Sequence, residues 1–104
     1  MANNSNIHVG DVGSNFLFTI KDGDDIVDIS GQTLLQIILD KPDRTQVTKT
    51  GILYTDGTDG IVKWTTAASS DLDIPGWWRA QAYIEIGSLH WHSSDIRFKV
   101  LPNL

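Results

Sequence analysis

Alternation of apolar and polar side chains dominates the sequence and is longest between Trp77 and Ile86. One set of side chains is apolar (Trp78, Ala80, Ala82, Ile84, Ile86), and the other is polar apart from two aromatics (Trp77, Arg79, Gln81, Tyr83, Glu85). A period of two residues is typical of a long, half-buried strand. The small Ala80 and Ala82 leave room for large side chains from a facing sheet. This stretch therefore predicts a central antiparallel strand with one face toward a core and the other toward water or a partner.

Shorter runs of the same kind recur along the chain between turns rich in Gly, Asp and Pro. They predict strands at Asn15–Lys21, Ile26–Ile29, Thr33–Leu39, Thr45–Thr50, Ile61–Thr66, Leu89–Ser94 and Ile96–Val100. The polar, β-branched run Thr45–Thr50 is predicted to be an edge strand. Residues Ala67–Asp73 are predicted to form one helical turn capped by Ser69 or Ser70. About seven or eight short strands without a longer helix indicate an all-β, antiparallel sandwich.

The division of the chain follows from the same pattern. Residues 1–14 are polar and punctuated by glycine, with Ile7 and Val9 among the few apolar side chains, so we expect an extended N-terminal arm. A single sandwich domain is predicted at residues 15–101, followed by a short C-terminal tail at residues 102–104. The arm, anchored by Ile7 and Val9, is predicted to add a strand to a neighbouring subunit's sheet edge.

Composition excludes several classes of function. The chain has 104 residues and no cysteine, so a disulfide framework and a thiolate metal site are both excluded. Its net charge is −5 and its eight Lys and Arg residues are scattered, which disfavours sequence-independent binding to nucleic acid. Apolar runs fall far short of the roughly 20 residues that span a bilayer, and no leader segment is recognisable, so we expect neither a membrane anchor nor a signal peptide.

Three groups of side chains are candidates for sites of chemistry. His90 and His92 share one strand face and would need a third ligand, such as His8 or Asp95, to hold zinc. The acidic turns have aspartates but not the spacing of a calcium loop, and turn chemistry explains them (Asp22, Asp24, Asp25, Asp56, Asp59). Nothing places two of the remaining carboxylates as a glycosidase pair (Asp71, Asp73, Glu85). We therefore expect no metal, no cofactor and no catalytic residue.

Three segments in a fixed order resemble a known family. They are Ile20–Gly31, with its Lys-Asp-Gly-Asp-Asp turn and Val-Asp-Ile-Ser-Gly ending; Thr55–Trp64, with two Asp-Gly pairs; and Leu72–Gly76, which leads into a Trp-bearing strand. Together they resemble the immunoglobulin-like domain at the N-terminus of phage baseplate upper proteins and of small phage virion proteins. The match spans roughly Val9 to Val100.

The resemblance implies an immunoglobulin-like sandwich that serves as a structural module of a tailed bacteriophage, made in the host bacterial cytoplasm and assembled into the virion. In baseplate proteins the domain anchors a longer chain with a receptor-binding end, whereas this sequence stops at Leu104. It therefore favours an adaptor of the tail, neck or baseplate, or a cement protein that decorates the capsid. Other virion proteins and further copies of the chain are the implied partners.

The tryptophans point to a binding surface. The chain has four, and if Trp78 faces the core then Trp77 faces outward with Arg79 and Tyr83. Trp, Tyr and Arg are the residue types that dominate interface hot spots. Two other interpretations stay open: the domain's own loops cover Trp77, or the aromatic side chains stack on sugars in a carbohydrate-binding module.

Overall fold

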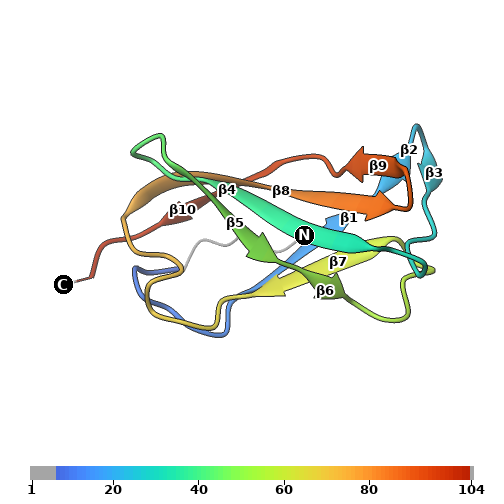
Figure 1. Cartoon of the computed structure of the whole chain (residues 1–104). Coiled ribbons are helices and arrows are strands. Elements are labelled where there is room, and N and C mark those ends of the chain that lie inside the picture. Colours follow the sequence, from blue (N-terminus) through green and yellow to red (C-terminus); the bar gives the residue numbers. More distant parts are fainter. Residues whose placement is uncertain (1–6, 104) are drawn as a thin grey trace.

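The computed structural model of the chain describes residues 7–103 and is an antiparallel β-sandwich without helices in that range (Figure 1). Among these residues, no helix is present that is long and apolar enough to cross a membrane. A three-stranded sheet packs on a five-stranded sheet, and a small two-stranded hairpin extends from one end. The predicted all-β sandwich is therefore confirmed.

The smaller sheet has the order β1-β7-β6, with β1 at Asn15–Thr19, β6 at Ile52–Leu53 and β7 at Ile61–Thr65. The larger sheet has the order β10-β8-β4-β5, with β4 at Leu34–Asp40, β5 at Gln46–Thr50, β8 at Gly76–Ile86 and β10 at Ile96–Val100; β9 (Leu89–His92) also pairs with β8. β2 (Lys21–Asp22) and β3 (Asp25–Ile26) form the separate hairpin.

Strand β8 is the centre of the larger sheet, as its alternation predicted. It pairs with β4 on one side and with β9 and β10 on the other. Its inward side chains Trp78, Ala80, Ala82 and Ile84 are buried. The absence of bulk at the two alanines lets large side chains of the opposite sheet approach, in accordance with the close packing of protein interiors.

Aromatic rings connect the two sheets through the core. Phe16 on β1 stacks on Trp64 of β7, with 5.4 Å between ring centroids, and contacts Phe98 of β10 at 4.7 Å. Phe98 in turn stacks on Trp78 at 6.1 Å. Offset and tilted contacts of this kind add to the free energy gained from burial. The core is therefore centred where β1 and β7 face β8 and β10.

Several local predictions differ from the structure. The returning strand expected at Ile26–Ile29 is only β3. One more bond continues the hairpin, from the Val27 amide to the Ile20 carbonyl, but the Ile20 amide donates to Gly60 and the Ile29 amide donates to Gly57, so the ladder ends there. The helical turn expected at Ala67–Asp73 is a non-helical turn. The backbone amides of Ala67 and Ala68 donate to the carboxylate of Asp71, so Asp71 takes the capping role predicted for Ser69 or Ser70.

The segment before β1 packs on the domain over residues 7–14, so in this range it is not a free arm. Ile7 lies in the core with 8% of its surface exposed, and half-buried Val9 packs against the core. A parallel bridge joins His8 to Leu101, in which Leu101 donates to the Ile7 carbonyl at 2.8 Å and Val9 donates to the Leu101 carbonyl at 3.0 Å. The rest of the predicted arm, residues 1–6, and Leu104 of the predicted tail lie outside the described residues.

Candidate docking face

The outer face of the five-stranded sheet carries three of the predicted interface residues. Trp77, Arg79 and Tyr83 alternate with the buried side chains of β8 and all point away from the core. Trp77 has 61% of its surface exposed, so no loop within residues 7–103 covers it. The outward orientation predicted for these side chains is confirmed. We call this surface the β8 face.

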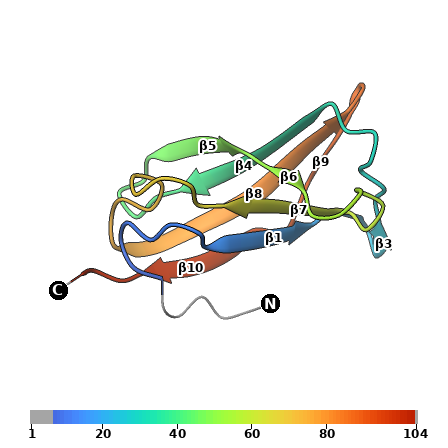
Figure 2. The ribbon, with the colours of Figure 1, turned by 90° about the horizontal axis from the view of Figure 1, so that it is seen from below.

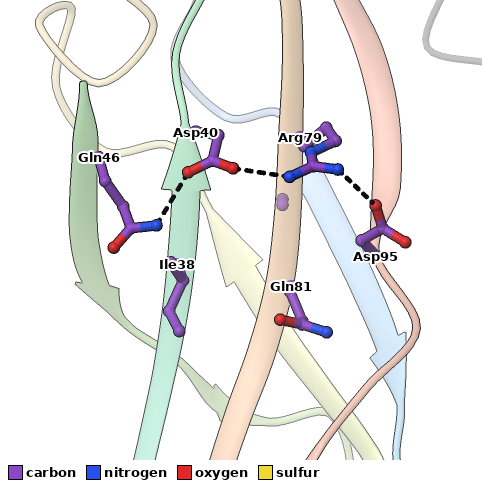
Figure 3. A pocket seen from close by; sticks show the side chains of 7 residues that line it. Ile38, Asp40, Gln46, Arg79, Gln81 and Asp95 are labelled. Carbon is purple, nitrogen blue, oxygen red and sulfur yellow. Dashed lines mark hydrogen bonds and ion pairs between the residues drawn. The ribbon is translucent and has the colours of Figure 1, made fainter. Parts of the chain in front are cut away.

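Arg79 is held in one orientation by side chains from two neighbouring segments (Figure 3). One guanidinium nitrogen donates to Asp40 Oδ2 at 3.0 Å, and another lies 3.7 Å from Asp95 Oδ2. Asp40 is opposite Arg79 in the β4–β8 register, and its second oxygen accepts a hydrogen bond from Gln46 Nε2 at 2.9 Å. The hydrogen bonds from Gln46 and Arg79 lower the pKa of Asp40, so at neutral pH this carboxylate is negatively charged beside the guanidinium group of Arg79.

These groups surround an open depression of about 370 Å³. Its polar rim is formed by Arg79, Asp40, Gln46, Gln81 and Asp95, and Ile38 adds an apolar side chain (Figure 3). One cation against two carboxylates leaves a net negative charge. The depression therefore offers hydrogen-bond acceptors and one oriented cation to a protein partner, and its exposed ion pairs contribute little to folding stability.

Tyr83 is also oriented by its neighbours. Its hydroxyl donates to Glu85 Oε2 at 2.6 Å, and its ring lies 4.9 Å from the His92 ring and 6.0 Å from the His90 ring, measured between centroids. The hydrogen bond to Glu85 raises the pKa of the Tyr83 hydroxyl, with burial and the negative charge of Glu85 acting in the same direction. The phenol is thus held protonated, with its aromatic ring set between imidazoles of β9.

Trp77 and Tyr83 do not form a single aromatic cluster. Trp77 is opposite Lys99 of β10 at one end of β8, whereas Tyr83 is opposite His92 of β9. At about 3.3 Å per residue, the two aromatic residues are roughly 20 Å apart along the strand, with Arg79 between them. A sugar ring would therefore stack on one of the two aromatics at a time.

The two remaining predicted interface residues are placed differently. Ile7 and Val9 pack against their own domain beside Leu101, at the end of β10. Asn103 also donates its side-chain amide to the Val9 carbonyl at 2.9 Å. An insertion of Ile7 into a neighbour would first have to remove it from this core.

Two of the aspartates named as metal candidates, Asp56 and Asp59, are hydrogen-bonded within their own loop. Within residues 7–103, no group of three His, Cys, Asp or Glu side chains is arranged to hold a metal ion. In the loop before β7, Asp56 accepts from the amide and hydroxyl of Thr58, and Asp59 accepts from Thr55 and the Ile61 amide. These aspartates shape their loop, as turn chemistry predicted.

Sequence reasoning did not identify the side chains that orient Arg79 and Tyr83. Asp40 and Asp95 are distant in sequence from Arg79 and reach it through strand pairing and the loop before β10. His90 and His92 were noticed as a pair, and the β8–β9 hairpin is the local signal that would have placed them beside Tyr83. No protein-family model matches the chain, and no curated protein matches it.

Proposed function

We propose that this chain is a non-enzymatic adaptor module of a tailed-bacteriophage virion that docks onto other virion subunits through the β8 face. The virion assignment rests on the resemblance of Ile20–Gly31, Thr55–Trp64 and Leu72–Gly76 to the immunoglobulin-like domain of baseplate upper proteins. The sandwich fold and the division of its strands between the sheets agree with that resemblance.

The observation that carries the docking proposal is the arrangement of Arg79 and Trp77. Arg79 is hydrogen-bonded to Asp40 and lies close to Asp95, so it is partly oriented toward a partner before binding, and less side-chain entropy is lost on docking. Trp77 presents a large apolar surface on the same face. Buried Trp and Arg side chains contribute most to affinity in protein interfaces. A subunit that covers this face would thus gain both an apolar anchor and an oriented cation.

Position in the particle is tested by copy number. Quantitative mass spectrometry of purified phage particles, referenced to the major capsid protein, would give a small number set by tail symmetry for an adaptor of the tail, neck or baseplate. A number comparable with that of the capsid protein would instead make the chain a cement protein that decorates the head. Absence from particles would overturn the virion assignment.

Docking is tested by substitutions on the β8 face. Trp77→Ala and Arg79→Ala should each reduce incorporation into particles, and weaken binding to the neighbouring subunit by at least about tenfold. Ile26→Ala is the matched control, because Ile26 is an exposed apolar residue on the separate β2–β3 sheet, which does not pair with β8. Equal incorporation of all three variants would remove the β8 face from the proposal. Glycan binding that Trp77→Ala abolishes, with no loss of incorporation, would support a carbohydrate-binding module instead.

A further inference from the structure

Strand β1 leaves one edge of the smaller sheet without a neighbouring strand among the described residues. The sheet order is β1-β7-β6, and Figure 2 shows β1 at the border of its sheet, with β10 of the other sheet beyond it. In immunoglobulin-type sandwiches a preceding strand A borders the strand equivalent to β1. Here the preceding segment bonds through His8 to Leu101, at the end of β10, and does not pair along β1.

The pattern of hydrogen bonds along β1 shows which of its backbone groups point away from β7. Ser14 accepts from the Thr66 amide, and Ile20 donates to the Gly60 carbonyl, so the even-numbered residues bond toward β7. Alternate residues of an antiparallel strand turn their N–H and C=O groups to opposite sides. The N–H and C=O groups of the odd-numbered residues therefore point to the open edge (Asn15, Leu17, Thr19).

Several other sheet edges carry features that hinder pairing with another chain. β10 carries Arg97 and Lys99, β5 carries Lys49, and β6 has only two residues. Charged side chains and short lengths are the usual means by which edge strands avoid pairing with another chain. β1 reads Asn-Phe-Leu-Phe-Thr and contains no charge, no proline and no bulge against β7. Its edge is therefore suited to accept a strand.

We propose that the partner of this edge is the β1 strand of a second copy of the chain, paired antiparallel about a two-fold axis at Leu17. The open positions are symmetric about Leu17, so Leu17 would meet Leu17 of the second copy and Asn15 would meet Thr19. Each pair would exchange two backbone hydrogen bonds, giving about six in all. The uncharged strands bring no like charges together, and Lys21 would lie opposite a glycine, Gly13.

The surroundings of the edge leave room for this pairing. A hollow of about 380 Å³ runs beside β1, lined on the far side by His92, Ser94 and Ile96. Leu17 and the exposed Ile52 are both register partners of Lys63, one on each side of β7, so the three side chains share the outer face of the sheet. When the two β1 strands pair, the two three-stranded sheets would form one continuous six-stranded sheet with a Leu17 contact at its centre.

The dimer is expected to be weak. Five residues of strand bury much less than the roughly 800 Å² per partner of a standard interface. We therefore expect dissociation in the range of about 10 µM to 1 mM, and a higher dimer fraction where many copies are held together. The inference does not depend on the virion assignment, because it concerns the isolated protein in solution.

Sedimentation equilibrium up to about 1 mM protein tests the dimer and its interface. Leu17→Lys should weaken self-association at least about tenfold, since it brings two ammonium groups together at the axis. Ile52→Lys is the matched control on the same sheet face at the opposite edge, and it should leave self-association unchanged. A wild-type protein that stays monomeric at 1 mM, or equal behaviour of the two variants, would overturn the proposal.

Cross-linking tests the two-fold register without relying on the stability of Leu17→Lys. The chain has no cysteine, so Leu17→Cys introduces a single thiol. Opposed residues of a hydrogen-bonded pair have Cα atoms about 5.5 Å apart, which is within the range of a disulfide. Under mild oxidation this variant should form a disulfide dimer at least about tenfold faster than Thr48→Cys on the edge strand β5. Equal rates would overturn the register.

Amide hydrogen exchange adds a control within the same strand. At high protein concentration, the amides of Leu17 and Thr19 should become protected, whereas that of Phe18, bonded toward β7, should be protected at every concentration. Concentration-independent exchange at Leu17 and Thr19 would contradict pairing through this edge.

Discussion

The carboxylate of Asp71, in the loop between β7 and β8, accepts a hydrogen bond from the ammonium group of Lys49 on edge strand β5, with 2.9 Å between Oδ1 and Nζ. Its second oxygen accepts from the amides of Ala67 and Ala68 at 2.8 and 3.0 Å. Asp71 is buried, with 7% of its surface exposed. One side chain thus closes the loop and attaches it to the edge of the larger sheet.

Replacement of Asp71 by alanine should lower the free energy of unfolding by about 2 to 4 kcal/mol, because it leaves two amides and an ammonium group without their acceptor. Asp73→Ala is the matched control. Asp73 pairs with Lys41 at 3.0 Å, but 42% of its side chain is exposed, so its loss should cost less than about 1 kcal/mol. Urea denaturation of both variants measures the difference, and equal losses would contradict the role assigned to Asp71.

Acid should remove the contribution of Asp71. Burial acts to raise the pKa of this carboxyl, but hydrogen bonds from Lys49 and the amides of Ala67 and Ala68 outweigh it, so its pKa lies below the ordinary value of 3.8. The unfolded chain then binds a proton more readily than the folded protein. The stabilisation is therefore complete above about pH 4 and is lost as the pH falls through the folded-state pKa.

The corresponding measurement compares wild type with Asp71→Asn by urea denaturation from neutral pH to about pH 2.5. The stability difference between them should stay constant above about pH 4 and shrink below it. The pKa of Asp40 is also lowered, so wild type and variant share the remaining acid dependence and the comparison isolates Asp71. A difference that does not change with pH would contradict the assignment.

Truncation of the adjacent residues Trp77 and Trp78 should change the free energy of unfolding by very different amounts. Trp78 is fully buried and donates its indole N–H to the Ile74 carbonyl at 3.0 Å, whereas Trp77 is 61% exposed. Trp78→Ala should destabilise the protein by about 3 to 5 kcal/mol, and Trp77→Ala by less than about 0.5 kcal/mol. Thermal unfolding followed by circular dichroism measures both. A large loss for Trp77→Ala would show that this residue supports the fold, and its variant could not then be used to test docking.

Gly57 lies where the loop before β7 passes against the backbone of Ser30. Its φ is 94°, and an added Cβ would lie 2.7 Å from both Cα and N of Ser30. Because backbone atoms cannot move aside as a flexible side chain can, Gly57→Ala should cost about 3 kcal/mol or more. Gly31→Ala meets no atom within 4 Å and needs no positive φ, so it should change stability by less than about 0.5 kcal/mol. Similar melting temperatures for the two variants would contradict this account.

The sequence predicted the direction in which side chains point more reliably than it predicted which residues lie beside them. The alternation in β8 correctly separated Trp78 from Trp77, and alternation is also visible in β1, where Phe16 and Phe18 are buried. It failed at Ala67–Asp73, where a helix propensity was outweighed by the carboxylate of Asp71 bonding the amides of a tighter turn.

The sequence by itself determined which face of the long strand β8 is buried, because the pleat of a strand turns successive side chains to opposite sides whatever its neighbours are. Only the tertiary structure decided which strands lie side by side. It brought Asp40 and Asp95 to Arg79, buried Ile7 beside Leu101, and left β1 at a sheet edge with no neighbouring strand within residues 7–103. These relationships depend on pairing between segments far apart in the chain, and a local pattern of apolar and polar residues does not specify the partner of a strand.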